Sequence, residues 1–186
     1  MMSKNKYLLP IKEEKFPYVV IDSPAHIIVK EGEKIYDLTK AMDFTCKEGT
    51  EIYAALSGKV TFILDKVNKT WNQDASPPEE AMKSEEQDGN YVVIEHSNKE
   101  FTIYSHLSLH SINVKEGENV KTGQLLGHSG NTGWSMGPHL HFMVHNFPEE
   151  NKGGYKSLTP NWGKELEERL KEKIISFKKI PKKYLK

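Results

Sequence analysis

Short apolar runs, separated by glycine, proline and charged turns, fill the first 145 residues of the chain. Residues 18–21, 58–63 and 91–96 are rich in β-branched and aromatic side chains and lack the 3.6-residue period of an amphipathic helix. Such runs are typical of short β-strands. The pattern therefore predicts a mainly β protein whose antiparallel sheets are joined by tight turns.

One pair of runs has the pattern of a β-hairpin. Residues 91–96 are followed by a polar turn at 97–100, and residues 101–107 return with similar apolar character. Because side chains alternate between the two faces of a strand, the returning run predicts that Thr102, Tyr104 and His106 share one face.

The end of the chain has a different period. Leu166, Leu170, Ile174 and Phe177 recur at intervals of three or four residues. This spacing predicts an amphipathic α-helix over 163–179 whose apolar stripe packs against the β domain.

Length and pattern together indicate one good-sized domain with extensions, since 186 residues are too few for two large domains. Between two predicted strands, residues 65–89 have loop composition and an acidic second half, which predicts a long loop. That loop either lines a binding groove or is an insertion without a role in binding. We expect N-terminal strands over 1–35, a β domain over 36–162, and a helix with a basic tail over 163–186.

Charge and cysteine content exclude several classes of protein. The chain has 26 Lys and Arg against 26 Asp and Glu, so neither nucleic acid nor a charged membrane is expected as its main partner. Residues 164–186 carry nine Lys and Arg against four Glu, an excess that we interpret as a solvated helix and tail. One cysteine, Cys46, allows no intrachain disulfide, and no apolar run is long enough to predict a transmembrane helix.

Two histidines on one predicted strand are the first candidates for chemistry. The glycine-rich residues 127–137 lead into an apolar strand in which His139 and His141 project from the same face. Neutral imidazole binds zinc and also titrates near neutral pH, so this pair suits a metal ligand beside an acid–base group. The alternative is a pair of surface histidines on a half-exposed strand.

Asp43 and His106 are further candidates on two other predicted strands. A hydrolytic zinc site commonly uses three protein ligands and leaves a fourth position for water. Taken alone, Asp43 could equally cap a turn, and His106 could equally be a strand histidine with satisfied hydrogen bonds. Only their combination with His139 and His141 favours a metal site.

An ordered set of short motifs carries a resemblance to a known family. The set includes Asp43-Phe44, Gly49-Thr50, Gly89-Asn90-Tyr91-Val92, Tyr104-Ser105-His106-Leu107, Gly130-Asn131-Thr132-Gly133 and Gly137-Pro138-His139-Leu140-His141-Phe142. Over residues 40–145 the chain resembles the lysostaphin/LytM-type zinc metallopeptidases, which hydrolyse peptide cross-links of bacterial peptidoglycan. The resemblance implies the duplicated hybrid motif fold, in which antiparallel β-sheets form a groove in a sandwich-like or open-barrel-like arrangement.

The resemblance also implies roles for individual residues. Asp43 and His141 match the aspartate and the second histidine that bind Zn²⁺ in that family. His106 and His139 match the pair that transfers protons or stabilises the developing oxyanion. Peptidoglycan peptides would be the substrate, outside the cytoplasm at the periplasm or cell surface. The N-terminus shows no apolar secretion signal, so a cytoplasmic location stays open.

One position departs from the family pattern. The first zinc ligand should stand four residues before Asp43, where this chain has Thr39. A neutral hydroxyl is a poor zinc ligand compared with imidazole. A substitute ligand could come from His26 or Asp37, which lie upstream, or the site could have no third ligand.

These observations leave three functions open. The first is a zinc-dependent endopeptidase of peptidoglycan. The second is a degenerate, metal-free relative that binds the cell wall or activates a partner hydrolase. The third is a sugar phosphotransfer carrier of related β fold, which would need neither a metal nor Asp43 and fits the Gly-Pro-His-Leu-His run less well.

Overall fold

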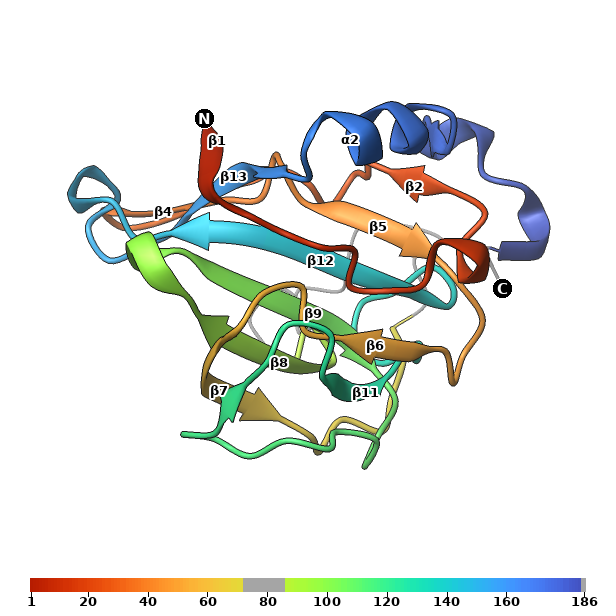
Figure 1. Ribbon diagram of the computed structural model, residues 1–186, viewed down its shortest axis with the longest axis horizontal. Helices are drawn as coiled ribbons and strands as arrows, with labels where there is room; N and C mark the ends of the chain where they lie inside the picture. The colour runs from red at the N-terminus through yellow and green to blue at the C-terminus, as the bar shows by residue number, and fades with distance from the viewer. Residues whose placement is uncertain (72–85, 185–186) are drawn as a thin grey trace.

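One long strand, β12 (His139–Asn146), runs through the middle of the molecule in the computed structural model (Figure 1). The structure describes residues 1–71 and 86–184. On one side β12 pairs antiparallel with β9 (Phe101–Leu107), and on the other it pairs with β5 (Met42–Thr45) and then with β13 (Lys156–Asn161). Every other part of the sheet is connected to β12 through these three neighbours.

The larger sheet follows the order β10–β7–β8–β9–β12–β13–β4–β3. Its remaining members along this path are β10 (Asn119–Val120), β7 (Gly58–Leu64), β8 (Asn90–Glu95), β4 (Lys34–Asp37) and β3 (Ile28–Glu31). A separate two-stranded sheet joins β6 (Glu51–Tyr53) to β11 (Leu125–His128). The mainly β architecture predicted from the sequence is confirmed.

The predicted hairpin is also confirmed, since β8 and β9 pair antiparallel across the short turn Ser97–Lys99. Most strand pairs are antiparallel as expected. Strand β13 pairs in parallel with β1 (Met2–Lys6) and with β4. A third parallel pair joins β2 (Val19–Val20) to β14 (Ile174–Ile175). Of the predicted long loop over 65–89, residues 72–85 lie outside the described residues.

Aromatic side chains from neighbouring strands form the centre of the core. Phe142 of β12 contacts Tyr104 of β9 and Phe44 of β5, with ring centroids 5.3 and 6.4 Å apart. Trp162 covers the same ring at 5.7 Å. Tyr104 is fully buried, and its hydroxyl accepts a hydrogen bond from the backbone N–H of Ala55 at 2.9 Å, so its polar atom is satisfied.

The C-terminal helix is shorter than the apolar spacing predicts. Helix α2 covers Lys164–Lys171, and Leu170 is buried against the core as expected for the apolar stripe. The prediction of a helix over 163–179 is wrong beyond Lys171, because β14 (Ile174–Ile175) pairs in parallel with β2 (Val19–Val20). Strand pairing thus overrides helical periodicity there.

In the part of the chain that the structure describes, no helix has the length and apolar character needed to span a lipid bilayer.

Truncation of the central aromatic ring tests the importance of the β12 core. We expect Phe142→Ala to lower the free energy of unfolding by about 3–5 kcal/mol, because it removes a fully buried ring contacted from three sides. Urea denaturation of the metal-free protein measures this change. The matched control is Phe62→Ala, whose side chain is 44% exposed; equal losses for the two variants would contradict this assignment of the core.

Candidate metal centre

Strand pairing places the candidate residues beside one another. Asp43 of β5 stands directly opposite His141 of β12, and Thr45 stands opposite His139. Residues paired in this way have side chains on the same face of the sheet, with Cβ atoms about 4.5–5.5 Å apart. Leu140 and Phe142 point to the other face, into the core, and are fully buried. The alternation predicted for the His-x-His run therefore holds.

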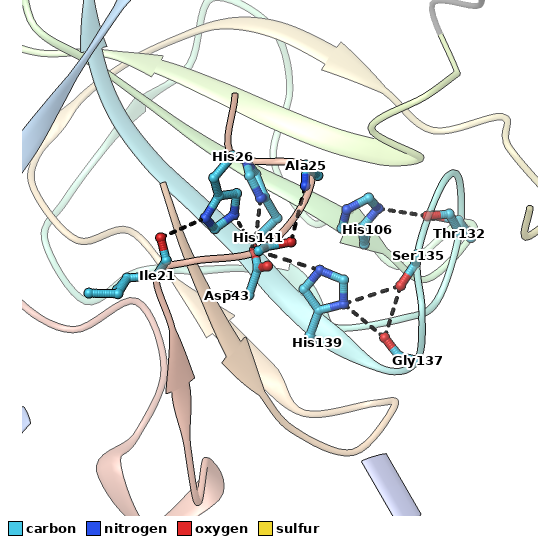
Figure 2. Close-up of polar contacts among 11 residues, drawn as sticks. Ile21, Ala25, His26, Asp43, His106, Thr132, Ser135, Gly137, His139 and His141 are labelled. Atoms are coloured by element: carbon cyan, nitrogen blue, oxygen red, sulfur yellow. Dashed lines mark hydrogen bonds and ion pairs between the residues drawn. The ribbon is translucent and has the colours of Figure 1, made fainter. Parts of the chain in front are cut away.

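A third candidate ligand atom comes from outside the two strands. His26 lies in the segment between β2 and β3, and its Nε2 is 3.1 Å from Asp43 Oδ1. His141 Nδ1 is 2.9 Å from the same oxygen. Ligand atoms of these three residues all lie within 4.8 Å of one another, and Figure 2 shows the two rings directed at the Asp43 carboxylate.

The outer nitrogen of His26 is held by the backbone. Its Nδ1 is 3.3 Å from the carbonyl oxygen of Ile21, to which it donates a hydrogen bond when the proton is on Nδ1 (Figure 2). That tautomer leaves Nε2 with its lone pair directed at the centre. A metal-binding histidine is commonly oriented in this way through its second nitrogen.

Thr39 and Asp37 do not take part in this group. The Thr39 hydroxyl donates to Asp37 Oδ1 at 2.7 Å, and the Thr39 backbone N–H donates to the same oxygen at 2.9 Å. Ser157 Oγ donates to it as well, at 3.2 Å. Asp37 Oδ1 therefore stabilises the β4–β5 connection. Of the three possibilities that the sequence left open, namely His26, Asp37 or no third ligand, the geometry favours His26.

His106 reaches the site by a route that simple alternation does not predict. Tyr104 points into the core, so an even strand would send the His106 side chain there too. Instead His106 has a positive φ of 62°, and the β8–β9 register shifts between Asn90 and Val92. This β-bulge turns the ring towards β12, with ring centroids 4.7 Å from His139 and 5.9 Å from His141. The prediction that Thr102, Tyr104 and His106 share a face is therefore wrong at His106.

Backbone carbonyls orient both remaining histidines. The Nδ1 atom of His106 lies 2.8 Å from the carbonyl oxygen of Thr132, and Nδ1 of His139 lies 2.8 Å from that of Gly137 (Figure 2). Since a carbonyl only accepts, each Nδ1 carries the proton in these contacts. Each Nε2 is then an acceptor, and that of His139 lies 3.8 Å from Asp43 Oδ1.

The environment fixes the charge of each group. Burial alone would raise the pKa of Asp43, but the imidazoles of His26 and His139 and the hydrogen bond from His141 hold its pKa well below the usual range. Burial opposes protonation of His26, yet the Asp43 carboxylate raises the pKa of this histidine. The centre thus presents an ionised carboxylate.

The other two histidines are kept neutral. Burial lowers the pKa of His106 well below its usual value, and the neighbouring His139 and His141 lower it further. Burial also lowers the pKa of His139, against the opposing effect of Asp43. Both rings are therefore unprotonated at Nε2 near neutral pH, which leaves that atom available as a general base.

A small cavity lies over the centre. Its volume is about 50 Å³, enough for water molecules. Trp134 and Met136 form one wall, from the glycine-rich loop that precedes β12. Phe177, Ile180 and Tyr184 of the C-terminal segment form another wall. The sequence pattern assigned Phe177 to a helix stripe and gave no indication that the end of the chain borders the site.

Comparison with known proteins identifies the family. The sequence profile of Peptidase family M23 matches residues 37–155, which is well over half of the chain. The protein belongs to this family, and the resemblance to lysostaphin/LytM-type peptidases is confirmed. His26 and the wall formed by the C-terminal segment both lie outside the matched residues.

Individual relatives agree with this assignment. The peptidoglycan DD-endopeptidase ShyA of Vibrio cholerae is 57% identical over 56 residues, which cover 30% of this chain and 13% of that protein. The DD-carboxypeptidase/endopeptidase Mpg of Neisseria meningitidis is 32% identical over 129 residues, or 69% of this chain and 25% of that protein. The aligned parts thus span a quarter or less of these relatives.

Among solved structures, a zinc-containing peptidase from Vibrio cholerae is similar, with a TM-score of 0.52 and 27% sequence identity. The similarity covers 75% of this chain and 36% of that one.

His145 continues the histidine face of β12 two residues beyond Met143. Its ring stacks on Phe101 at a centroid distance of 5.5 Å and also contacts Phe147 and Tyr155. Only 4% of the residue is exposed, and within the described chain its Nδ1 has no hydrogen-bond partner. Burial, with a smaller effect from His96, lowers the pKa of His145 to about 3.

The lowered pKa of His145 predicts a pH-dependent loss of stability. The unfolded chain binds this proton near pH 6.5 and the folded chain only near pH 3, so the free energy of unfolding falls as pH drops through this range. We expect His145→Gln to reduce that slope by up to about 1.4 kcal/mol per pH unit. Urea denaturation of the metal-free protein at pH 4.5 to 6.5 measures how the free energy of unfolding changes with pH. The same pH dependence in His145→Gln and in the unaltered protein would show that the pKa of His145 is not lowered by folding.

Proposed function

We propose that this protein is a zinc-dependent endopeptidase that hydrolyses peptide cross-links of bacterial peptidoglycan. The observation that carries the proposal is the convergence of His26, Asp43 and His141 beside two neutral histidines. The names of the relatives ShyA and Mpg support a peptidoglycan substrate. Because peptidoglycan lies outside the cytoplasmic membrane, the proposal includes an extracytoplasmic site of action.

The three side chains fit zinc in chemistry and in spacing. Two imidazoles and one carboxylate are a donor set found in catalytic zinc sites, which keep a fourth position open. Tetrahedral ligands at the usual zinc distances lie about 3.3 Å from one another. The contacts from Asp43 Oδ1 to His26 and His141, 3.1 and 2.9 Å, need only slight expansion.

Zinc bound there would supply a Lewis acid that polarises the scissile carbonyl and lowers the pKa of water. The neutral His139 has its Nε2 directed at the centre, so it can take a proton from attacking water and return it to the leaving amine. His106 lies beside it as a second neutral imidazole, whose Nε2 can accept a hydrogen bond from the attacking water while its Nδ1 is held by the Thr132 carbonyl. Trp134 and Met136, on one side of the cavity, would position the peptide.

Thr39 supports a second candidate, a metal-free module that binds the cell wall or activates a partner hydrolase. Its hydroxyl is bonded to Asp37, so the ligand position of the family motif is not available to a metal. His26 favours the enzyme, because it restores a third ligand atom at the centre.

Metal analysis together with a peptidoglycan-clearing assay tests the proposal. We expect one zinc per chain and clearing that stops on addition of a chelator. His139→Ala should retain zinc but lose about 10²–10⁴-fold in activity, since a proton-transfer group is removed. Protein without stoichiometric zinc that still binds peptidoglycan would instead establish the binding module.

Substitution of the third ligand separates the possible metal sites. We expect His26→Ala to weaken zinc binding by more than about 100-fold, because changing a residue that merely orients a ligand already costs 10–100-fold. Asp37→Asn is the matched control and should bind zinc as the unaltered protein does. Competition with a chromophoric chelator measures both affinities, and the reverse order would assign Asp37 as the ligand.

A further inference from the structure

Two segments outside the family-matched residues 37–155 meet beside the metal centre. One is residues 19–27, which begins with β2 and carries His26. The other is residues 174–184, which begins with β14. These segments pair in parallel, with Ile174 opposite Val19 and Ile175 opposite Val20. Val20 in turn pairs with Asp43, so β14 lies two strands away from a proposed ligand.

Asp22 ties the two segments together directly after this pairing. Its Oδ1 accepts a hydrogen bond from the backbone N–H of Phe177 at 2.6 Å, and its Oδ2 accepts one from Ser176 Oγ at 2.7 Å. Both carboxylate oxygens are therefore used on the C-terminal segment. These two bonds lower the pKa of Asp22, which agrees with a carboxylate held in its ionised form.

His26 depends on the same short segment for its position. Its Nδ1 contacts the carbonyl of Ile21, the residue before Asp22. Its backbone N–H donates to the carbonyl of Ser23 at 2.9 Å, the residue after Asp22. The ring and the backbone of His26 are thus fixed by the two neighbours of Asp22, and a displacement of Asp22 would move both attachments.

We propose that the C-terminal segment 174–177 positions His26 for metal binding, and that it acts through Asp22. The inference rests on the proposed role of His26 as a zinc ligand. In this arrangement Asp22 is a positioning residue, since it touches neither substrate nor metal. In the family motif the corresponding ligand stands at the position of Thr39, on the connection that leads into β5. Here His26 would replace that ligand, and segment 174–177 would hold His26 in place.

The competing explanation is that Asp22 only anchors the end of the chain. An anchor of that kind would contribute to the stability of the metal-free protein and leave zinc affinity unchanged. The positioning role instead predicts a change in zinc affinity that requires His26. The two explanations therefore differ in a measurable quantity.

The main experiment compares zinc dissociation constants of full-length variants by chelator competition. We expect Asp22→Ala to weaken zinc binding by about 10–100-fold, as substitutions that release a metal ligand do. Asp22→Asn keeps an oxygen that can accept the hydrogen bond from the Phe177 backbone N–H, so its loss of zinc affinity should be smaller. Asp65→Ala is the matched control, because Asp65 also accepts a backbone N–H at 2.6 Å, from His110, and does not line the metal cavity. It should bind zinc normally.

A double-mutant cycle with His26 supplies the deciding readout. In the His26→Ala background, Asp22→Ala should produce no further loss of zinc affinity, because the ligand that Asp22 positions is already gone. Thermal unfolding of the metal-free variants records any purely structural effect separately. Additive losses in the cycle, or normal zinc binding by Asp22→Ala, would overturn the positioning role while leaving the zinc site intact. Normal zinc binding by His26→Ala would overturn the ligand assignment and the positioning role together.

Discussion

The antiparallel register between β5 and β12 is the constraint on which the site depends. It sets Asp43 opposite His141 and, two residues away, Thr45 opposite His139. Because side chains alternate along a strand, a slip of one residue would send both histidines into the core and Leu140 and Phe142 to the surface. The buried contacts of Phe142 with Phe44 and Tyr104 oppose such a slip. The apolar face of β12 thus maintains the geometry of its polar face.

Two local departures from regular structure complete the centre. His106 adopts a left-handed conformation, which costs a non-glycine residue about 1–3 kcal/mol, and in return its ring stands beside His139. His26 is delivered by an irregular segment that is itself held by β2 and by the end of the chain. The regular sheet provides Asp43, His139 and His141, and irregular backbone provides His106 and His26.

Much of this was predictable from sequence because it rests on short-range patterns. Alternation gave the common face of His139 and His141, and the turn at 97–100 gave the β8–β9 hairpin. The bulge at His106 was not predicted, since the alternation of side chains along a strand carries no information on φ. The early end of α2 was missed because Ile174 and Ile175 suit a strand as well as a helix, and only their partner β2 decides between the two.

His26, the third member of the cluster with Asp43 and His141, could be named from the sequence only as one of several possibilities, for a related reason. His26 and Asp37 both precede Asp43, and nothing in their spacing shows that Asp37 is bonded to Thr39 and Ser157 while His26 faces the centre. Distance along the chain is a poor guide here, because His26 is brought close by strand β2, which pairs with β5 only in the folded state.

The pairing of β2 with β14 has a consequence for how the protein matures. Residues near the two ends of the chain must come together before the segment that holds His26 is complete. During synthesis, Asp43 and His141 leave the ribosome well before Ser176 and Phe177. A nascent or C-terminally trimmed chain would lack the two hydrogen bonds that Asp22 accepts, next to the segment that carries His26. Assembly of this corner of the molecule therefore follows the synthesis of residues 174–177.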